Sequence, residues 1–506
     1  MSQITESIQK PKRSFGFIFM LCLIAGPFLT ALSSSIINVA LPDIASSYNS
    51  SLTDVQWVIS GYALAMAAML VACAFMSKRF GDSKVYFVSM IGFTLASIAC
   101  ALAPSLGWLI FARIVQGACG APLVPIVMNI LLNSRGEGDS VVPVEFGLIL
   151  FLAPAIGPTV GGLLINWFSW PVVFLLNVPI ALAAAAVLLL DREKTMSKHD
   201  IIDRNARFDI IGTLALAAGL VLTIYGSTRG PQDGWTSMSV LPLIVGGIVL
   251  ILFYLGWALV KPKPAIDLKL IRNAKTALTL LVSLITVITA MSVLFLVPII
   301  MESVQGYSVL DAGMAMLPQG IMMGIGIVVS EMIIKKGWLS VRTLVMAGIL
   351  LLAVSTASML GFEMSTPTWA SALILAARGL SMGMVIQPLL TEMLITLRPE
   401  EASDGNTLFN VAQQLGASIG ISAAATIFQT QAIGYVGQVL AVNHINAGPI
   451  HIGGSGSALS KLPAAMLDQI NTAIFHGFHD TVLVLVGLAL IGVLLSLFLK
   501  STKKQA

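Results

Sequence analysis

The residues of this chain that could do chemistry are a few charged side chains within long apolar segments. Arg113 and Arg378 each interrupt an apolar run. Four carboxylates lie within or at the ends of such runs: Glu145, Glu302, Glu331 and Glu392. A charge inside a membrane costs roughly 2.5–3.5 kcal/mol, so each is expected to face a polar interior and a partner. There a carboxylate can take up and release a proton near neutral pH. The alternatives are that Arg113 pairs with backbone carbonyls and that the carboxylates extend to the membrane surface.

The elements that position these charges must be membrane helices. The 506-residue chain has 57% hydrophobic side chains and 10% charged residues, and its mean hydropathy is +0.92. Soluble domains carry roughly 25% charged residues. The composition therefore excludes a soluble enzyme, a nucleic-acid binder and a secreted disulfide scaffold. The sequence also lacks a phosphate-binding Gly-x-x-x-x-Gly-Lys-Ser/Thr loop, so we expect no nucleotide. We expect no metal or other cofactor either, because His476-x-x-His479-Asp480 offers three ligands without a cysteine.

Uninterrupted apolar runs predict an all-α, multi-pass protein with fourteen transmembrane helices. Their ranges are 15–42, 54–77, 85–103, 108–134, 141–165, 172–190, 208–227, 239–260, 276–300, 313–334, 343–361, 369–397, 406–431 and 481–499. With both termini in the cytoplasm, this count places 24 of the 28 Lys and Arg residues on the cytoplasmic side. Cytoplasmic loops of membrane proteins carry this excess of basic residues, which supports the count and the orientation.

Landmarks of the first half recur in the second half. Arg113 and Arg378 lie at corresponding positions, 265 residues apart. Two elements with glycine at four-residue spacing end at Gly157 and Gly420, which are 263 residues apart. The repeat predicts two six-helix bundles with two helices inserted between them. The expected division is a cytoplasmic tail (1–14), an N-terminal bundle (15–190), a linker with the inserted helices (191–275), a C-terminal bundle (276–499) with an external loop (432–480), and a cytoplasmic tail (500–506).

Short motifs that follow one another in order resemble the major facilitator superfamily, in particular fourteen-span drug:proton antiporters of the EmrB/QacA type. They are Asn38-Val-Ala-Leu-Pro42, Arg113-Ile-Val-Gln116-Gly117, Ala153-Pro-Ala-Ile-Gly157-Pro158-Thr-Val-Gly161-Gly162, Asn177-Val-Pro179, Gly306-Tyr307-Ser308 and Asn410-x-x-Gln413-Gln414-Leu415-Gly416. The resemblance covers nearly the whole chain. It implies a major facilitator fold and transport in a bacterial cytoplasmic membrane.

The motif around the predicted fifth helix is similar to the antiporter signature of that family. Gly157, Pro158, Gly161 and Gly162 predict a kinked helix with a bare side that another helix can approach closely. The resemblance implies that this motif marks exporters. Ordinary tight helix packing is the alternative.

Arg113 stands where the family has an arginine that works with an acid on the first helix, which carries the coupling proton. Here Ser33 occupies the position of that acid. Proton coupling would then depend on Arg113 and the other carboxylates, Glu145, Glu302, Glu331 and Glu392. We expect Glu145 and Glu331 to line the inner mouth between the two bundles.

The basic turn after the second span resembles the gating turn of the family with its charges rearranged. It contains Lys78, Arg79, Gly81 and Asp82, and Gly81 can adopt the positive φ that a tight turn needs. The resemblance implies that this turn pairs with the start of the fifth helix of the second bundle, which carries Asp404. A Lys78–Asp404 pair is therefore expected; the alternative is a basic anchor without a gating role.

Polar and aromatic residues on the predicted spans are candidates for a substrate cavity. They are Asn38, Tyr62, Gln116, Asn177, Gln319, Gln387, Phe409 and Gln413. The 23 methionines would suit a deformable apolar cavity that admits several compounds. Packing and hydrogen bonding between helices is the alternative role for each of these residues.

The expected function is proton-coupled export of amphiphilic toxic compounds across the cytoplasmic membrane by alternating access. The partners implied are the lipid bilayer, small amphiphilic substrates, protons and, by resemblance, a membrane-fusion-type adaptor. Alternatives are a dedicated exporter of one metabolite or antibiotic, such as a fatty acid, an amino acid or tetracycline, and an uncoupled facilitator or membrane sensor. Proton release from everted vesicles on addition of drugs would discriminate between antiport and the uncoupled or sensory roles.

Overall fold

The computed structural model describes residues 17–133, 160–190, 209–261, 268–398, 401–443 and 464–499 without residues 51 and 308, together with residues 153, 156, 157, 264 and 266. In this part of the chain, twelve helices are long and apolar enough to span a membrane. Fourteen spans were predicted. The predicted span 141–165 lies largely outside the described residues, and the predicted span 172–190 is a shorter apolar helix.

In the N-terminal bundle, the structure describes eight helical elements. They are α1 (Phe17–Ser47), α2 (Leu52–Val55), α3 (Trp57–Phe80), α4 (Asp82–Ala101), α5 (Leu106–Gly120), α6 (Leu123–Asn133), α8 (Val172–Leu175) and α9 (Asn177–Leu190). Residues 160–167 are also helical. The predicted span 108–134 is divided into α5 and α6, because Pro122 lacks the N–H that would continue α5.

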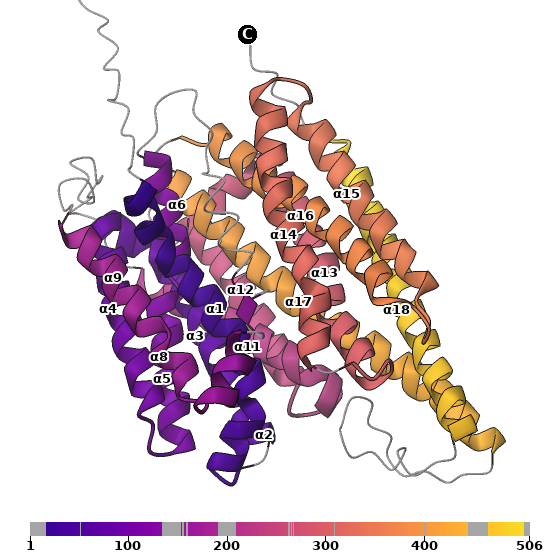
Figure 1. Ribbon diagram of the computed structural model, residues 1–506. Coiled ribbons are helices and arrows are strands. Elements are labelled where there is room, and N and C mark those ends of the chain that lie inside the picture. Colours follow the sequence, from indigo (N-terminus) through magenta and orange to yellow (C-terminus); the bar gives the residue numbers. More distant parts are fainter. Residues whose placement is uncertain are drawn as a thin grey trace, which may run out of the picture.

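The C-terminal bundle follows two inserted helices, α11 (Ile210–Asp233) and α12 (Leu241–Val260). Its elements are η1 (Leu268–Arg272), α13 (Ala274–Ser303), α14 (Val309–Lys335), α15 (Val341–Ala357), η2 (Ser358–Gly361), α16 (Thr368–Thr396), α17 (Ala402–Val442) and α18 (Ala464–Ser496). Figure 1 shows the two bundles side by side, with α11 and α12 between them. The inserted α11 packs against α3 of one bundle and α17 of the other.

Both bundles use the same close helix contact. A Cβ atom on Gly117 of α5 would collide with the backbone carbonyl of Tyr62 on α3, and one on Gly383 of α16 would collide with that of Met323 on α14. Only glycine permits such an approach. The equivalent contacts support the internal repeat that was predicted from the sequence.

The predicted external loop 432–480 is wrong over much of its length. Helix α17 continues to Val442 and α18 begins at Ala464, so residues 432–442 and 464–480 are helical. Their polar residues lower the hydropathy, but their apolar faces are buried against each other. Val436 and Leu440 of α17 belong to the same core as Phe478 of α18.

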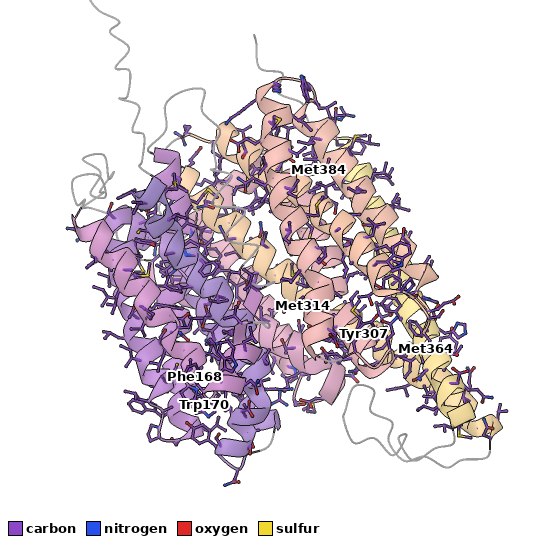
Figure 2. All side chains as sticks on the ribbon, in the orientation of Figure 1. Phe168, Trp170, Tyr307, Met314, Met364 and Met384 are labelled. Atoms are coloured by element: carbon purple, nitrogen blue, oxygen red, sulfur yellow. The ribbon has the colours of Figure 1, made fainter. Side chains whose placement is uncertain are left out.

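Basic side chains gather at one end of the bundles, which we call the basic end. It includes the ends of α3 and α14, with Lys78, Arg79, Lys335 and Lys336. Helix α1 begins, and α18 ends, at this end (Figure 1). Phe168 and Trp170 lie toward the opposite end of the N-terminal bundle (Figure 2).

Candidate functional site

Arg113 lies completely buried on α5, in a cage whose hydrogen-bond acceptors come from α1, α3 and α5 itself. Its Nε donates to the carbonyl of Val58 on α3 at 2.9 Å, and its Nη1 donates to Ser33 Oγ on α1 at 3.1 Å. Nη1 also donates to Gln116 Oε1, one turn along α5, at 2.7 Å. All three acceptors are neutral. Among the described residues, no carboxylate forms an ion pair with Arg113.

Aromatic and polar side chains complete the Arg113 cage. The guanidinium lies over the ring of Tyr62, with its carbon 4.0 Å from the ring centre, and 5.8 Å from that of Phe174. Gln116 in turn donates from Nε2 to Ser97 Oγ on α4 at 2.7 Å. The structure thus places the predicted cavity residues Tyr62 and Gln116 directly against Arg113.

Arg378 occupies the equivalent place on α16 and is also completely buried. It donates to Thr356 Oγ1 on α15 and, at 3.3 Å, to the carbonyl of Thr289 on α13. In each bundle, therefore, a buried arginine donates to the first helix. Arg378 also donates directly to a hydroxyl on α15, whereas Arg113 is linked to the Ser97 hydroxyl on α4 only through Gln116. Sequence reasoning found both arginines and, through the family resemblance, Ser33, but it missed Thr356, because serine and threonine are common in these spans.

The candidate proton-coupling carboxylates do not gather around Arg113 in the described structure. Glu331 forms an ion pair with Lys335 of its own helix, at 2.9 Å. Glu302 is exposed near the end of α13, and Glu392 is half-buried on α16. Glu145 lies outside the described residues, so its predicted approach to Glu331 stays a prediction.

The glycines of the signature motif pack against α1. A Cβ atom on Gly157 would collide with Ser35, and one on Gly161 would lie 2.6 Å from Ile36 Cγ1. At Gly162 the nearest atom, Val39 Cγ1, would be 3.9 Å away, which is an ordinary contact. Pro158 lies outside the described residues. The structure therefore gives Gly157 and Gly161 a close-packing role, whereas Gly162 has room for a methyl group.

The same arrangement occurs in the second bundle. A Cβ atom on Gly416 of α17 would lie 3.1 Å from the carbonyl of Leu284, and one on Gly420 would lie 2.5 Å from that of Ile288. Both carbonyls belong to α13, the counterpart of α1. The first helix of each bundle is therefore packed against a glycine-spaced helix.

The predicted gating turn joins the two bundles. Lys78 Nζ at the end of α3 lies 2.6 Å from Asp404 Oδ2 at the start of α17, so the expected pair is present. Gly81 has a φ of +85°, a conformation that glycine adopts without strain. Asp82 begins α4 and accepts a hydrogen bond from Ser77 Oγ. Arg79 is half-exposed beside Lys78.

A second contact between the bundles at the basic end involves asparagine side chains, and sequence reasoning missed it. Asn406 Nδ2 on α17 donates to the carbonyl of Pro125 at 3.1 Å and to Asn129 Oδ1 at 3.2 Å. Asn129 lies on α6, and both asparagines are buried. The only signal in the sequence was the position of Asn406, two residues after Asp404.

The remaining cavity candidates are spread over both bundles. Asn177 and Gln319 are buried, and their side-chain oxygen atoms have no hydrogen-bond partner among the described residues. Gln387 Nε2 is buried and similarly unpaired within the described structure. Phe409 is buried in the core and Gln413 is half-buried. The helix backbone includes Asn38, but its side chain lies outside the described residues.

The two inserted helices are tied together by a charged cluster at the basic end. Asp209 precedes α11 and accepts hydrogen bonds from Lys261 Nζ at 2.7 Å, from the Gly212 backbone N–H at 3.1 Å and from Trp257 Nε1 at 3.1 Å. Burial alone would raise the pKa of Asp209, but these donors together lower it below its ordinary value. The cluster stabilises the hairpin and was not predicted.

The histidine-rich end of α18 does not form a metal site with the residues described. Asp480 accepts a hydrogen bond from Tyr435 at 2.9 Å, and His479 Nε2 contacts the carbonyl of Phe362 at 3.1 Å. Across the described ranges, no three His, Cys, Asp or Glu residues are close enough together to hold a metal ion.

Two helical bundles with buried arginines, joined by a charged contact at one end, define a polytopic membrane transporter. The family model of the Major Facilitator Superfamily matches residues 23–421, and the chain belongs to this superfamily. Its members are membrane transporters rather than enzymes.

Curated relatives agree with this assignment. The chain is 30% identical to the multidrug export protein EmrB of Escherichia coli strain K12 over 425 residues, which cover 83% of this chain and 82% of that protein. It is 27% identical to the uncharacterized MFS-type transporter YhcA of Bacillus subtilis strain 168 over 507 residues, covering 96% and 93% of the two chains. These similarities are consistent with the EmrB/QacA type predicted from the motifs.

Solved structures share the fold at low sequence identity. The human organic anion transporter MFSD10 superposes with a TM-score of 0.59 at 13% identity, covering 96% of this chain and all of that one. The proton:xylose symporter XylE gives a TM-score of 0.56 at 13% identity, covering 96% of each chain. At this identity the likeness establishes the fold alone.

Proposed function

We propose that this chain is a proton-coupled multidrug exporter that moves amphiphilic toxic compounds outward across the cytoplasmic membrane. The observation that carries the proposal is the contact between the two bundles at the basic end. Lys78 pairs with Asp404 across the bundles at 2.6 Å, and Asn406 holds α6 close by. Opening this end requires that these contacts break, as alternating access demands. The similarity to EmrB supports export of drugs in particular.

In this proposal the basic end and both termini face the cytoplasm, in accordance with the positive-inside rule. Substrate binds between the bundles, where the cavity candidates identified from the sequence contribute. The coupling proton is carried by one or more of Glu145, Glu302, Glu331 and Glu392, with Arg113 as the buried cation. Gly157 and Gly161 keep the backbone around them tightly packed against α1, and this packing limits the leakage of ions.

The experiment uses everted membrane vesicles that contain the full chain and a luminal pH dye. After the lumen is acidified, addition of a cationic, a neutral or an anionic drug is expected to release protons from the lumen. Glu331→Gln is expected to reduce this drug-dependent proton flux. Glu363→Gln is the matched control, because Glu363 is an exposed glutamate between η2 and α16. Proton flux that no drug changes would contradict antiport.

A second candidate, an uncoupled facilitator or membrane sensor, is favoured by one observation. Ser33 lies against Arg113 where the family has an acid, so the usual proton carrier is absent from the cage. Drug efflux that continues without a proton gradient would support this candidate. Transport of a single compound from a broad panel would support the dedicated exporter.

A further inference from the structure

The Arg113 cage is built to surround a cation but offers it only neutral partners. The guanidinium is completely buried and donates to Val58, Ser33 and Gln116 through Nε and Nη1. Its Nη2 atom is also buried and has no hydrogen-bond partner among the described residues. The cage thus leaves one of the two terminal nitrogens, with both of its N–H groups, unpaired.

Arginine keeps its positive charge in proteins, so the cage holds a permanent cation. A buried charge without an opposite charge is strongly unfavourable, and an unpaired buried N–H adds to that cost. The face of the Tyr62 ring offsets part of it. An anion beside Nη2 would offset the charge and accept a hydrogen bond from this nitrogen, because a hydrogen bond from arginine to a carboxylate is charge-assisted and about twice as strong as a neutral one.

Ser33 is the reason that the described part of the cage lacks a negative charge beside Arg113. Its Oγ lies 3.1 Å from Nη1, so a longer acidic side chain at this position would reach the guanidinium and neutralise it. Serine reaches the guanidinium but carries no charge. Within the described residues, therefore, nothing supplies the counter-charge of Arg113, and another molecule can supply it.

The geometry points to Arg113 as the binding site for the carboxylate of an anionic amphiphile, which is the exported substrate. This inference rests on the proposed exporter function and names its substrate class. The aromatic rings of Tyr62 and Phe174 beside the guanidinium provide apolar surface for the body of such a compound. Nη2 is enclosed in this conformation, so the anion reaches it when the surrounding helices move during the transport cycle.

Arg378 does not offer the same site, although it is buried at the equivalent position. There both terminal nitrogens are used, in hydrogen bonds to Thr356 and Thr289, and the unpaired atom is Nε. Of these two buried arginines, Arg113 has a terminal nitrogen left to donate to a carboxylate and Arg378 does not. Arg378 is therefore the matched control for the experiment.

The test measures binding rather than transport, so that it remains informative if the exporter proposal fails. Full-length protein in lipid nanodiscs is titrated with 1-pyrenebutyrate, with its neutral amide and with a pyrenyl ammonium compound of similar size. We expect the carboxylate to bind about tenfold more tightly than the amide, the ratio for one charge-assisted hydrogen bond. Equal affinity for the three compounds in the wild-type protein would overturn the inference.

Three variants assign the preference to Arg113. The carboxylate preference is the ratio of the affinity for 1-pyrenebutyrate to the affinity for its amide. Arg113→Gln is expected to reduce this ratio to about twofold or less, whereas Arg378→Gln is expected to leave it unchanged. Ser33→Asp supplies an internal carboxylate and is expected to abolish the preference with Arg113 still in place, which keeps the test valid if Arg113→Gln does not fold. Ser33→Asn, of similar size but neutral, is expected to retain it.

Two results would contradict the assignment. One is an unchanged carboxylate preference in Ser33→Asp at pH 8. The other is displacement of 1-pyrenebutyrate by chloride when sodium gluconate is replaced with sodium chloride at equal ionic strength, because the site would then hold an inorganic anion rather than the substrate. Charge-selective binding without drug-dependent transport would support the site and refute only the exporter proposal.

Discussion

Reversal of the charge at Lys78 is expected to weaken closure of the basic end. The Lys78–Asp404 pair joins α3 of one bundle to α17 of the other at 2.6 Å. The lysine side chain is 37% exposed, whereas the aspartate side chain is only 6% exposed. Lys78→Asp removes the ion pair and places a second negative charge beside the buried Asp404. Transport by the single variant should therefore fall.

The size of the effect follows from the partial burial of the pair. Exposed ion pairs contribute about 0.2–1 kcal/mol, and loss of one partner of a buried pair costs about 3–5 kcal/mol. A pair with one buried and one half-exposed member lies between these limits, at about 1–3 kcal/mol. This corresponds to a change of about 5- to 150-fold in the ratio of the conformations closed and open at the basic end.

The assay measures the distance between spin labels on Lys84 and Lys336, two exposed residues at the basic end of the different bundles. Lys78→Asp should increase the population with the longer distance. The double variant Lys78→Asp/Asp404→Lys restores opposite charges and should recover most of the short-distance population and of the transport. If the second substitution restores neither, the pair does not stabilise the closed conformation and the reasoning is refuted.

The Arg398–Glu401 ion pair provides a matched control. Its nitrogen–oxygen distance is also 2.6 Å, but it joins two residues three positions apart at the junction of α16 and α17. Arg398→Glu breaks an ion pair of the same length without separating the bundles. Its distance distribution should remain that of the wild-type protein.

Three further predictions concern packing, polar contacts and pH. Gly161→Val should lower the thermal unfolding temperature, because overpacking against Ile36 costs about 1–3 kcal/mol, whereas Gly162→Ala should leave it nearly unchanged. A nearly equal decrease of the unfolding temperature in both variants would contradict the close contact at Gly161. Asn406→Ala should favour the open basic end by about 1–3 kcal/mol, because it removes the hydrogen bonds from Asn406 to Asn129 and to the buried carbonyl of Pro125; an unchanged spin-label distance would argue against this contact. The pKa of Asp209 is lower in the folded protein than in the unfolded chain, where it is about 3.9. Its charge therefore stabilises the fold above about pH 3.9, and this stabilisation is lost as the pH falls through the folded pKa. Asp209→Asn should lower the unfolding temperature at neutral pH, and the difference from the wild-type protein should become smaller at acidic pH. A difference between the two proteins that does not depend on pH would show that the charge of Asp209 is irrelevant.

Much of the helical order could be predicted because a bilayer leaves the backbone few choices. An apolar run of about 20 residues must become a helix, so α3, α4 and α12 lie close to their predicted ranges. The same reasoning ended α17 too early and began α18 too late. Residues such as Tyr435 and Asp480 are polar and interrupt the apolar pattern, whereas the contacts that hold these segments together lie between the two helices, in this hydrogen bond and in the core that they share.

The candidate site could be located from the sequence but not assembled. Arg113 stands out because a charge interrupts an apolar run. Its partners could not be read from local pattern, since Ser33 is 80 residues away and Val58 is 55 residues away. The Lys78–Asp404 pair spans 326 residues, and only the family resemblance indicated it.

The length of α17 gives the molecule a mechanical property. Its 41 residues form one continuous helix, about 62 Å long at 1.5 Å per residue, which is twice the roughly 30 Å of the hydrocarbon core. Asp404 lies near one end and Tyr435 near the other, and Gly420 touches α13 between them. A rigid rod that pivots at such a contact acts as a lever, so its two ends swing in opposite directions. When the Lys78–Asp404 contact at the basic end breaks, the resulting movement of α17 would then reach its other end, near Tyr435, directly.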